Sequence, residues 1–260
     1  MNSRYLFGSL LVIPLLPLLA YQGKQVRKRV PSLPEATGPA GAAGQEFSDK
    51  GALNIITLGE STIAGVGVKT HKEGFSGTFT QSLAEQLQRP VNWRVYARGG
   101  YTAKRVRHKL VPKIEERALD LIVVGLGGND AFTLNSPGKW IADISGLIDD
   151  LQAKYPGTPI VFTNMPPIKE FPAFTPAIKF VIGNLVEILG EELDNKVSTL
   201  SNVYYLNEKL TLAQWARRLG IDPNAENFFS DGVHPSLFTY QIWAREVAAF
   251  VHQNVLAKAD

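Results

Sequence analysis

Three side chains in this sequence have types and positions suited to nucleophilic chemistry. Ser61 stands in a Gly-Glu-Ser-Thr turn directly after an apolar run that ends at Leu58. Asp231 and His234 stand three residues apart in an Asp-Gly-Val-His-Pro-Ser segment near the C-terminus. This spacing lets the carboxylate turn back onto one imidazole nitrogen while the other nitrogen faces outward. The pair therefore predicts an oriented general base, which a serine hydroxyl needs in order to become a good nucleophile.

An asparagine in a glycine-rich loop adds a candidate hydrogen-bond donor. Asn129 belongs to the run Gly-Gly-Asn-Asp at 127–130, which follows an apolar stretch ending at Gly125. Its amide can donate to an oxygen that gains negative charge during a reaction. A dinucleotide-binding loop is excluded, because its third glycine would fall on Asp130. We expect Asp130 to be structural, since a carboxylate pointing inward would oppose that negative charge.

The loop around Ser61 also has interpretations without catalysis. It is compatible with an ordinary strand-to-helix loop, and residues 65–70 superficially resemble a phosphate-binding loop. That loop requires glycine directly before the lysine, whereas Val68 precedes Lys69 here. The chain has no cysteine, which excludes thiolate metal sites, disulfides and a cysteine nucleophile. The other histidines lack a partner pattern and are expected at the surface or in the core: His71, His108 and His252.

Four short motifs, taken together in this order, resemble those of the SGNH hydrolase superfamily, the GDSL esterases and lipases. The resemblance spans about residues 53–252 and rests on Gly59-Glu60-Ser61, Ala97 to Thr102, Gly127 to Asp130 and Asp231 to His234. It implies that Ser61 is the nucleophile, that His234 is its general base and later acid, and that Asp231 orients His234. It also implies an oxyanion hole made of the backbone N–H groups of Ser61 and Gly100 and the side-chain amide of Asn129. Neither a metal nor an organic cofactor is implied.

Two residues depart from the family pattern. Glu60 takes the place usually held by aspartate, which leaves the catalytic residues in place but alters hydrogen bonds around the serine turn. Arg98 takes a place in the second motif where many members carry another polar residue, often asparagine.

The function implied by the resemblance is hydrolysis of carboxylic esters of apolar acyl groups through an acyl-enzyme on Ser61. Thioester hydrolysis or acyl transfer would use the same site. Loss of activity through Glu60 would instead leave a membrane-tethered binding module. The expected substrate is a small-molecule or lipid ester, and the sequence sets no oligomeric state.

Beyond residue 50, apolar runs of strand length alternate with stretches of helical period, which predicts an α/β domain over residues 51–260. Apolar stripes predict helices between the strands, for example the one that contains Ile144, Leu147 and Leu151. We expect a three-layer α/β/α domain with a five-stranded, mostly parallel, doubly wound sheet of flavodoxin-like type. Its ligand site would lie beyond the carboxyl ends of the strands. The predicted strands cover 53–58, 93–97, 121–125, 160–163 and 203–206.

A stretch rich in proline and aromatic residues, 164–180, follows the fourth predicted strand. We expect it to form a lip over the site, where an acyl chain would contact apolar side chains. The alternative is that these side chains simply cover the sheet. The candidate substrate-binding residues are Phe132, Met165, Phe171 and Phe174.

The net charge of +3 comes from the N-terminal end of the chain. Residues 1–30 carry five basic side chains and no acidic one, which leaves 22 basic against 24 acidic residues in the rest. Nucleic-acid binding needs a basic surface to replace counterions around phosphates. The slightly acidic body therefore argues against a nucleic-acid partner.

The basic leader contains an uncharged run of 17 residues, Tyr5 to Tyr21, which is broken by Pro14 and Pro17. We expect an apolar helix there that binds the membrane through residues 5–21, as in a bacterial inner-membrane protein. A cleaved signal peptide and an interfacial segment on anionic lipid are the alternatives. The basic flank favours a cytoplasmic catalytic domain over a periplasmic or secreted one.

The segment between the leader and the α/β domain, residues 31–50, is rich in proline, glycine and alanine. It has few large apolar side chains with which to form a core, so the composition predicts a flexible linker. We therefore expect a chain that lacks residues 1–50 to fold and to remain active.

Overall fold

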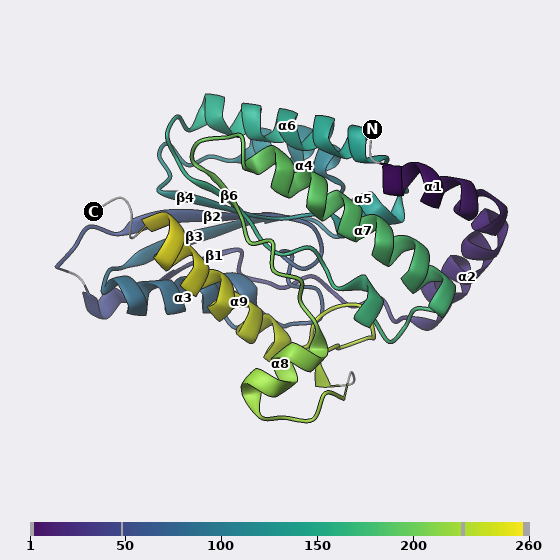
Figure 1. The fold of residues 1–260 in the computed structure, drawn as a ribbon. Coiled ribbons are helices and arrows are strands. Elements are labelled where there is room, and N and C mark those ends of the chain that lie inside the picture. The colour runs from purple at the N-terminus through teal and green to yellow at the C-terminus, as the bar shows by residue number, and fades with distance from the viewer. Residues whose placement is uncertain (1–2, 48, 225–226, 257–260) are drawn as a thin grey trace.

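The protein is described by a computed structural model that covers residues 3–47, 49–224 and 227–256. A central sheet lies between two layers of helices (Figure 1). One face is covered by α3 (Phe75–Leu87) and α9 (Leu237–Val251). The other face is covered by α4 (Ala103–Lys109), α6 (Pro137–Lys154) and α7 (Pro176–Val197). The predicted three-layer α/β/α domain is confirmed.

The described residues form a six-stranded sheet in the order β1-β3-β2-β4-β5-β6. The five strands from β2 to β6 are parallel, and their order is the one expected for a flavodoxin-like sheet. The sixth strand, β1, is antiparallel to β3 at one edge. The strands are β1 (Ala40–Ala43), β2 (Leu53–Gly59), β3 (Val91–Ala97), β4 (Leu121–Gly125), β5 (Ile160–Phe162) and β6 (Val203–Tyr205).

The core follows from the apolar pattern of these elements. All five residues of β4 are buried, as expected for a central parallel strand that helices cover on both faces. The stripe predicted on α6 is buried through Ile144, Leu147 and Leu151. Hydroxyl side chains at the N-caps define where several helices begin, because each accepts a hydrogen bond from a backbone N–H of the first turn. These caps are Thr102, Ser136, Thr175, Thr211 and Ser236, the fourth of which precedes α8 (Leu212–Leu219).

The segment expected to be a flexible linker is packed against the domain over residues 34–43. The backbone of Ala36 and Thr37 donates to carbonyls of the loop that follows β2, and residues 40–43 form β1. Small residues permit this close approach: a Cβ on Gly41 would lie 2.5 Å from the ring of Trp93. The small residues that suggest flexibility instead allow this backbone to pack against an aromatic ring. The described residues therefore form six strands rather than the five predicted.

The leader is helical, as expected, but is interrupted at its prolines. Helix α1 (Ser3–Val12) is followed by a 3-10 turn over Ile13–Leu15 and by α2 (Leu16–Arg29), and each proline stands in the first turn of its segment. Both helices contact α7, and Val26 of α2 is buried. Within the described parts of the chain, no single helix has both the length and the apolar character to cross a bilayer. Residues 4–10 and 13–29 meet that test only as a pair bent by 47°.

Candidate active site

The predicted nucleophile and the predicted amide donor follow two neighbouring strands. Ser61 comes just after β2, and Asn129 lies in the short helix α5 (Gly128–Phe132) after β4. These strands pair up to Gly59 and Gly125, at the point where the order of the parallel strands reverses. A Cβ on Gly59 would lie 2.2 Å from the carbonyl oxygen of Gly125, so the close approach of the strand ends requires glycine. Ligands of doubly wound sheets bind at this position.

Asp231 and His234 form the contact that their spacing predicts. Asp231 Oδ2 lies 2.8 Å from Nδ1 of His234, while Oδ1 accepts the backbone N–H groups of Val233 and His234 at 2.9 and 2.7 Å. The Asp231 side chain is fully buried, and that of His234 is 22% exposed. Burial opposes ionisation of Asp231, but the hydrogen bonds from His234 outweigh it and hold the pKa of Asp231 below its usual value. An ionised carboxylate therefore orients the imidazole.

The loop of His234 is held against the serine turn. Tyr240 of α9 donates its hydroxyl to the carbonyl of Val66 across 3.1 Å. A Cβ on Gly67 would lie 2.7 Å from Oγ of Ser230, so the two loops touch there as well. Among the described residues, Ser61 Oγ has no hydrogen-bond partner, so the hydroxyl is free to meet a base.

Glu60 connects the serine turn to helix α5. Its side chain is buried, and it accepts the backbone N–H groups of Gly128 and Asn129 at 2.8 and 2.9 Å. It also accepts the side-chain amide of Asn129 at 2.6 Å. Burial raises the pKa of Glu60 to about 7 despite these three donors, and the nearby charge of Asp130 adds to the rise. Glu60 departs from the family pattern, but it still places a carboxyl group between the serine turn and helix α5.

The amide of Asn129 is fully engaged in this structure. Nδ2 donates to Oε2 of Glu60 and to the carbonyl of Tyr101, at 2.6 and 3.2 Å. The backbone carbonyl of Tyr101 can only accept a hydrogen bond, which fixes the nitrogen on this side of the amide. The bond to Tyr101 is the longer of the two.

Asp130 has a structural role, as its position in the motif predicts. Its carboxylate is buried and accepts the backbone N–H of Ala103 at 2.9 Å and the side-chain amide of Asn135 at 2.7 Å. Burial raises the pKa of Asp130. The residue thus fixes the start of α4 relative to α5.

The second motif forms a tight turn beside Ser61. Tyr101 donates its N–H to the carbonyl of Arg98 across 3.3 Å, and Gly100 has a φ of 77°, which favours glycine. A Cβ on Gly99 would lie 3.9 Å from Cβ of Ser61. Within the part of the chain that the structure describes, the backbone N–H groups of Ser61 and Gly100 have no acceptor. Both predicted backbone donors are therefore available.

One residue at this turn was not predicted from the sequence. Glu35 accepts the N–H of Gly99 at 2.8 Å and pairs with the guanidinium of Arg98 at 3.1 Å. It lies between two prolines in the segment whose composition suggested a flexible linker. No local pattern indicates a contact with a loop more than sixty residues away.

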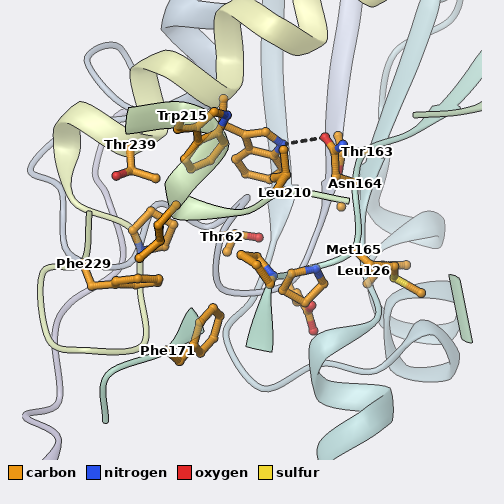
Figure 2. Close-up of a pocket in the computed structure, with 17 residues that line it drawn as sticks. Thr62, Leu126, Thr163, Asn164, Met165, Phe171, Leu210, Trp215, Phe229 and Thr239 are labelled. Carbon is orange, nitrogen blue, oxygen red and sulfur yellow. Dashed lines mark hydrogen bonds between the residues drawn. The ribbon is translucent and has the colours of Figure 1, made fainter. Parts of the chain in front are cut away.

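An apolar cavity of about 50 Å³ lies beside the serine turn (Figure 2). Thr62 and Pro235, the neighbours of Ser61 and His234, both line it, as do Trp215 and Phe229. At its wall the indole of Trp243 donates to Oδ1 of Asn164 across 3.2 Å, the bond that is dashed in Figure 2.

Two of the four candidate substrate-binding side chains, Met165 and Phe171, line this cavity. The other two continue outward from it as a row of ring contacts. The ring of Phe171 lies 5.4 Å from that of Phe174, which lies 5.4 Å from that of Phe132. Phe132 is 40% exposed, so the row joins the cavity to the surface. Among the described residues there is no cluster of three or more His, Asp or Glu side chains that could hold a metal ion.

Residues 57–242 match the GDSL-like Lipase/Acylhydrolase family. The chain belongs to this family. The match includes every predicted catalytic residue of this GDSL-like hydrolase, from Ser61 to His234. No curated protein matches the chain by sequence.

Solved structures share the fold of this GDSL-like hydrolase. A member of the lipolytic G-D-S-L family from Veillonella parvula matches with a TM-score of 0.57 and 16% identity, covering 78% of this chain and 100% of its own. A family 3 carbohydrate esterase from Clostridium thermocellum matches with a TM-score of 0.58 and 17% identity, covering 81% and 100%. The lipase/acylhydrolase from Enterococcus faecalis matches with a TM-score of 0.55 and 16% identity, covering 76% of this chain and 95% of its own.

Proposed function

We propose that this GDSL-like hydrolase cleaves carboxylic esters of apolar acyl groups through an acyl-enzyme on Ser61. The observation that carries the proposal is the Asp231–His234 contact at 2.8 Å, in a loop held against the serine turn. Such a pair supplies an oriented base to the hydroxyl, and the free N–H groups of Ser61 and Gly100 supply oxyanion donors.

In the proposed first step, Nε2 of His234 takes the proton of Ser61 Oγ as that oxygen bonds to the carbonyl carbon. The carbonyl oxygen becomes negative and is stabilised by the N–H groups of Ser61 and Gly100 and by the amide of Asn129. The protonated His234 then gives its proton to the departing alcohol oxygen, and the C–O bond breaks. Water repeats the sequence on the acyl-enzyme and releases the acid. Asp231 stays ionised throughout.

The apolar cavity beside the serine turn supports an apolar acyl group. Its volume of about 50 Å³ suits a short acyl chain, and the row of rings from Phe171 to Phe132 offers a path for a longer one. We infer that the enzyme acts on small-molecule or lipid esters. A thioester, or an acceptor other than water, would use the same acyl-enzyme.

A fluorophosphonate that reacts only with activated serines tests the proposal. We expect it to label the wild-type chain at Ser61 and not the Ser61→Ala variant, and we expect p-nitrophenyl esters of graded acyl length to be hydrolysed. A folded wild-type protein that is neither labelled nor active would instead be the inactive binding module. Product analysis with alcohol acceptors separates hydrolysis from acyl transfer.

For the leader, we propose attachment to a membrane with the catalytic domain on its cytoplasmic side. The support is chemical: residues 1–30 carry five basic side chains and no acidic one. Such a segment suits anionic lipid headgroups and apolar burial together. Exposed apolar side chains on the two helices and the turn between them are Leu6, Phe7, Leu10, Ile13, Leu16, Leu18 and Tyr21.

Cell fractionation tests this attachment. The full chain should sediment with membranes and resist extraction by high salt, because apolar burial is not screened as headgroup attraction is. Release by salt alone would reduce the contact to a peripheral one. Cleavage of the leader by protease added to intact cells would contradict the cytoplasmic orientation.

A further inference from the structure

The segment 34–37 runs along the serine turn and is fixed to it by backbone hydrogen bonds. Gly67 donates to the carbonyl of Pro34 at 3.2 Å, and Ala36 donates to that of Ala64 at 3.0 Å. A Cβ on Gly65 would lie 2.7 Å from Cβ of Ala36, so the two backbones are in close contact. Glu35, between these anchors, therefore has a defined position.

The carboxylate of Glu35 reaches from this segment to the turn that contains Gly100. Oε1 accepts the N–H of Gly99 at 2.8 Å, and Oε2 pairs with the guanidinium of Arg98 at 3.1 Å. A Cβ built on Gly99 would lie 3.2 Å from Oε1 of Glu35 and 3.9 Å from Cβ of Ser61. Glu35 and the proposed nucleophile thus flank the same glycine.

The two ends of that turn are held by other bonds: Arg98 donates its N–H to the carbonyl of Gly59 at 3.1 Å, and the carbonyl of Tyr101 accepts the amide of Asn129 at 3.2 Å. Among the described residues, the two glycines between these ends have one hydrogen-bond partner, Glu35. Gly99 and Gly100 have no side chain to restrict their backbone angles, and a 3.3 Å bond from the N–H of Tyr101 to the carbonyl of Arg98 spans them. An oxyanion donor contributes fully only when it is fixed before the reaction, and misplacement by about 1 Å can cost about 100-fold in rate. The bond from Gly99 to Glu35 fixes the peptide just before the Gly100 N–H.

The charge of Glu35 requires compensation at this place. An isolated carboxylate near an oxyanion would oppose its formation, whereas the pair with Arg98 is close to neutral. Arg98 departs from the family pattern, and its guanidinium is the group that balances the charge of Glu35.

We propose that Glu35 is a positioning residue of the active site, which fixes the Arg98–Gly99 peptide so that the N–H of Gly100 faces the oxyanion. This inference rests on the proposed esterase function. It gives one residue of the segment before the predicted domain a role in shaping the active site, although Glu35 itself does not touch the reacting atoms.

The test compares three variants for ester turnover and for the rate of fluorophosphonate labelling. Glu35→Ala should lower kcat by about 10- to 100-fold and change KM less than about threefold, because a transition-state donor is affected. Glu35→Gln keeps an oxygen acceptor for the Gly99 N–H and should restore most of the rate. Thr37→Val is the matched control, since it removes a 3.0 Å bond from the same segment to Lys69 without touching the turn. Its rate should stay within twofold of wild type.

Amide hydrogen exchange at Gly99 and Gly100 gives a readout that does not depend on activity. Exchange there should quicken in Glu35→Ala and not in Thr37→Val, with unchanged melting temperatures. Wild-type kcat in Glu35→Ala, or equal loss in Glu35→Gln and Glu35→Ala, would overturn the proposal. If the wild-type protein is inactive, the esterase function is refuted but the positioning contact is not. Unchanged exchange at Gly99 and Gly100 in Glu35→Ala would refute the positioning contact, whatever the activity.

Discussion

The side-chain amide of Asn129 donates to the buried carboxylate of Glu60 across 2.6 Å. Because Glu60 directly precedes Ser61, this bond ties the proposed oxyanion donor to the turn of the proposed nucleophile. The same carboxylate holds the first two N–H groups of α5. The positions of Ser61 and Asn129 are therefore coupled through one residue.

Glu60 should make the stability of the protein depend on pH. Burial raises its pKa to about 7 from an ordinary 4.5, so the folded protein binds this proton more tightly than the unfolded chain does. The stability it contributes is fully present below about pH 4.5 and is lost as the pH rises through 7, by roughly 3 kcal/mol in total. Urea unfolding of wild type and Glu60→Gln at pH 5 and 8 measures the effect. Equal pH dependence in both proteins would show that Glu60 does not titrate in this range.

Replacement of Asn129 by alanine should lower kcat/KM by about 100- to 1000-fold, since an oxyanion donor is lost. The bonds of the amide to Glu60 and Tyr101 are also lost, so the melting temperature must be measured beside the kinetics. Asn92→Ala serves as the control, because Asn92 bonds to Asn54 on an exposed part of the sheet. A near-normal rate in a folded Asn129→Ala protein would remove Asn129 from the oxyanion hole.

Ser61→Ala and His234→Ala should each lower ester turnover by several orders of magnitude. The double variant should lose little more, because nucleophile and base act in one step. Steady-state kinetics of the two single variants and the double variant decide this. Losses that multiply would indicate that the two residues act independently.

Two truncations should separate the leader from the active site. A chain that starts at residue 31 keeps Glu35 and β1, and we expect it to be folded and active. A chain that starts at residue 51 lacks both, leaves the outer edge of β3 unpaired, and should aggregate or lose at least about 10-fold in kcat. Soluble yield, melting temperature and ester turnover are the measurements. Full activity in the shorter chain would agree with the sequence-based expectation and contradict the structural one.

The parts of the fold and site that were predicted correctly depend on local sequence patterns. Strand β4 is a run of apolar residues that are all buried, and α6 has the expected stripe. The Asp231–His234 contact spans only three residues of one loop, so their spacing indicates it directly. In each case the side chains themselves carry the information.

The features that could not be predicted depend on contacts distant in sequence. Strand β1 reads Ala-Gly-Ala-Ala and is held by backbone bonds and by the fit of Gly41 beneath Trp93, neither of which has a side-chain signature. Glu35 meets Gly99 across 64 residues, and Glu60 meets Asn129 across 69. The sequence around a carboxylate that accepts backbone N–H groups does not differ from the sequence around an acidic residue at the surface.

The packed segment 34–43 also sets how far the active site can move from the leader. Arg29 ends α2, and Glu35, six residues later, is already fixed beside Ser61. An extended chain of six residues spans at most about 20 Å. The proposed nucleophile, Ser61, therefore stays within a short and nearly constant distance of the end of α2. For the membrane attachment proposed above, this short distance favours substrates at the same membrane surface over substrates reached on a long tether.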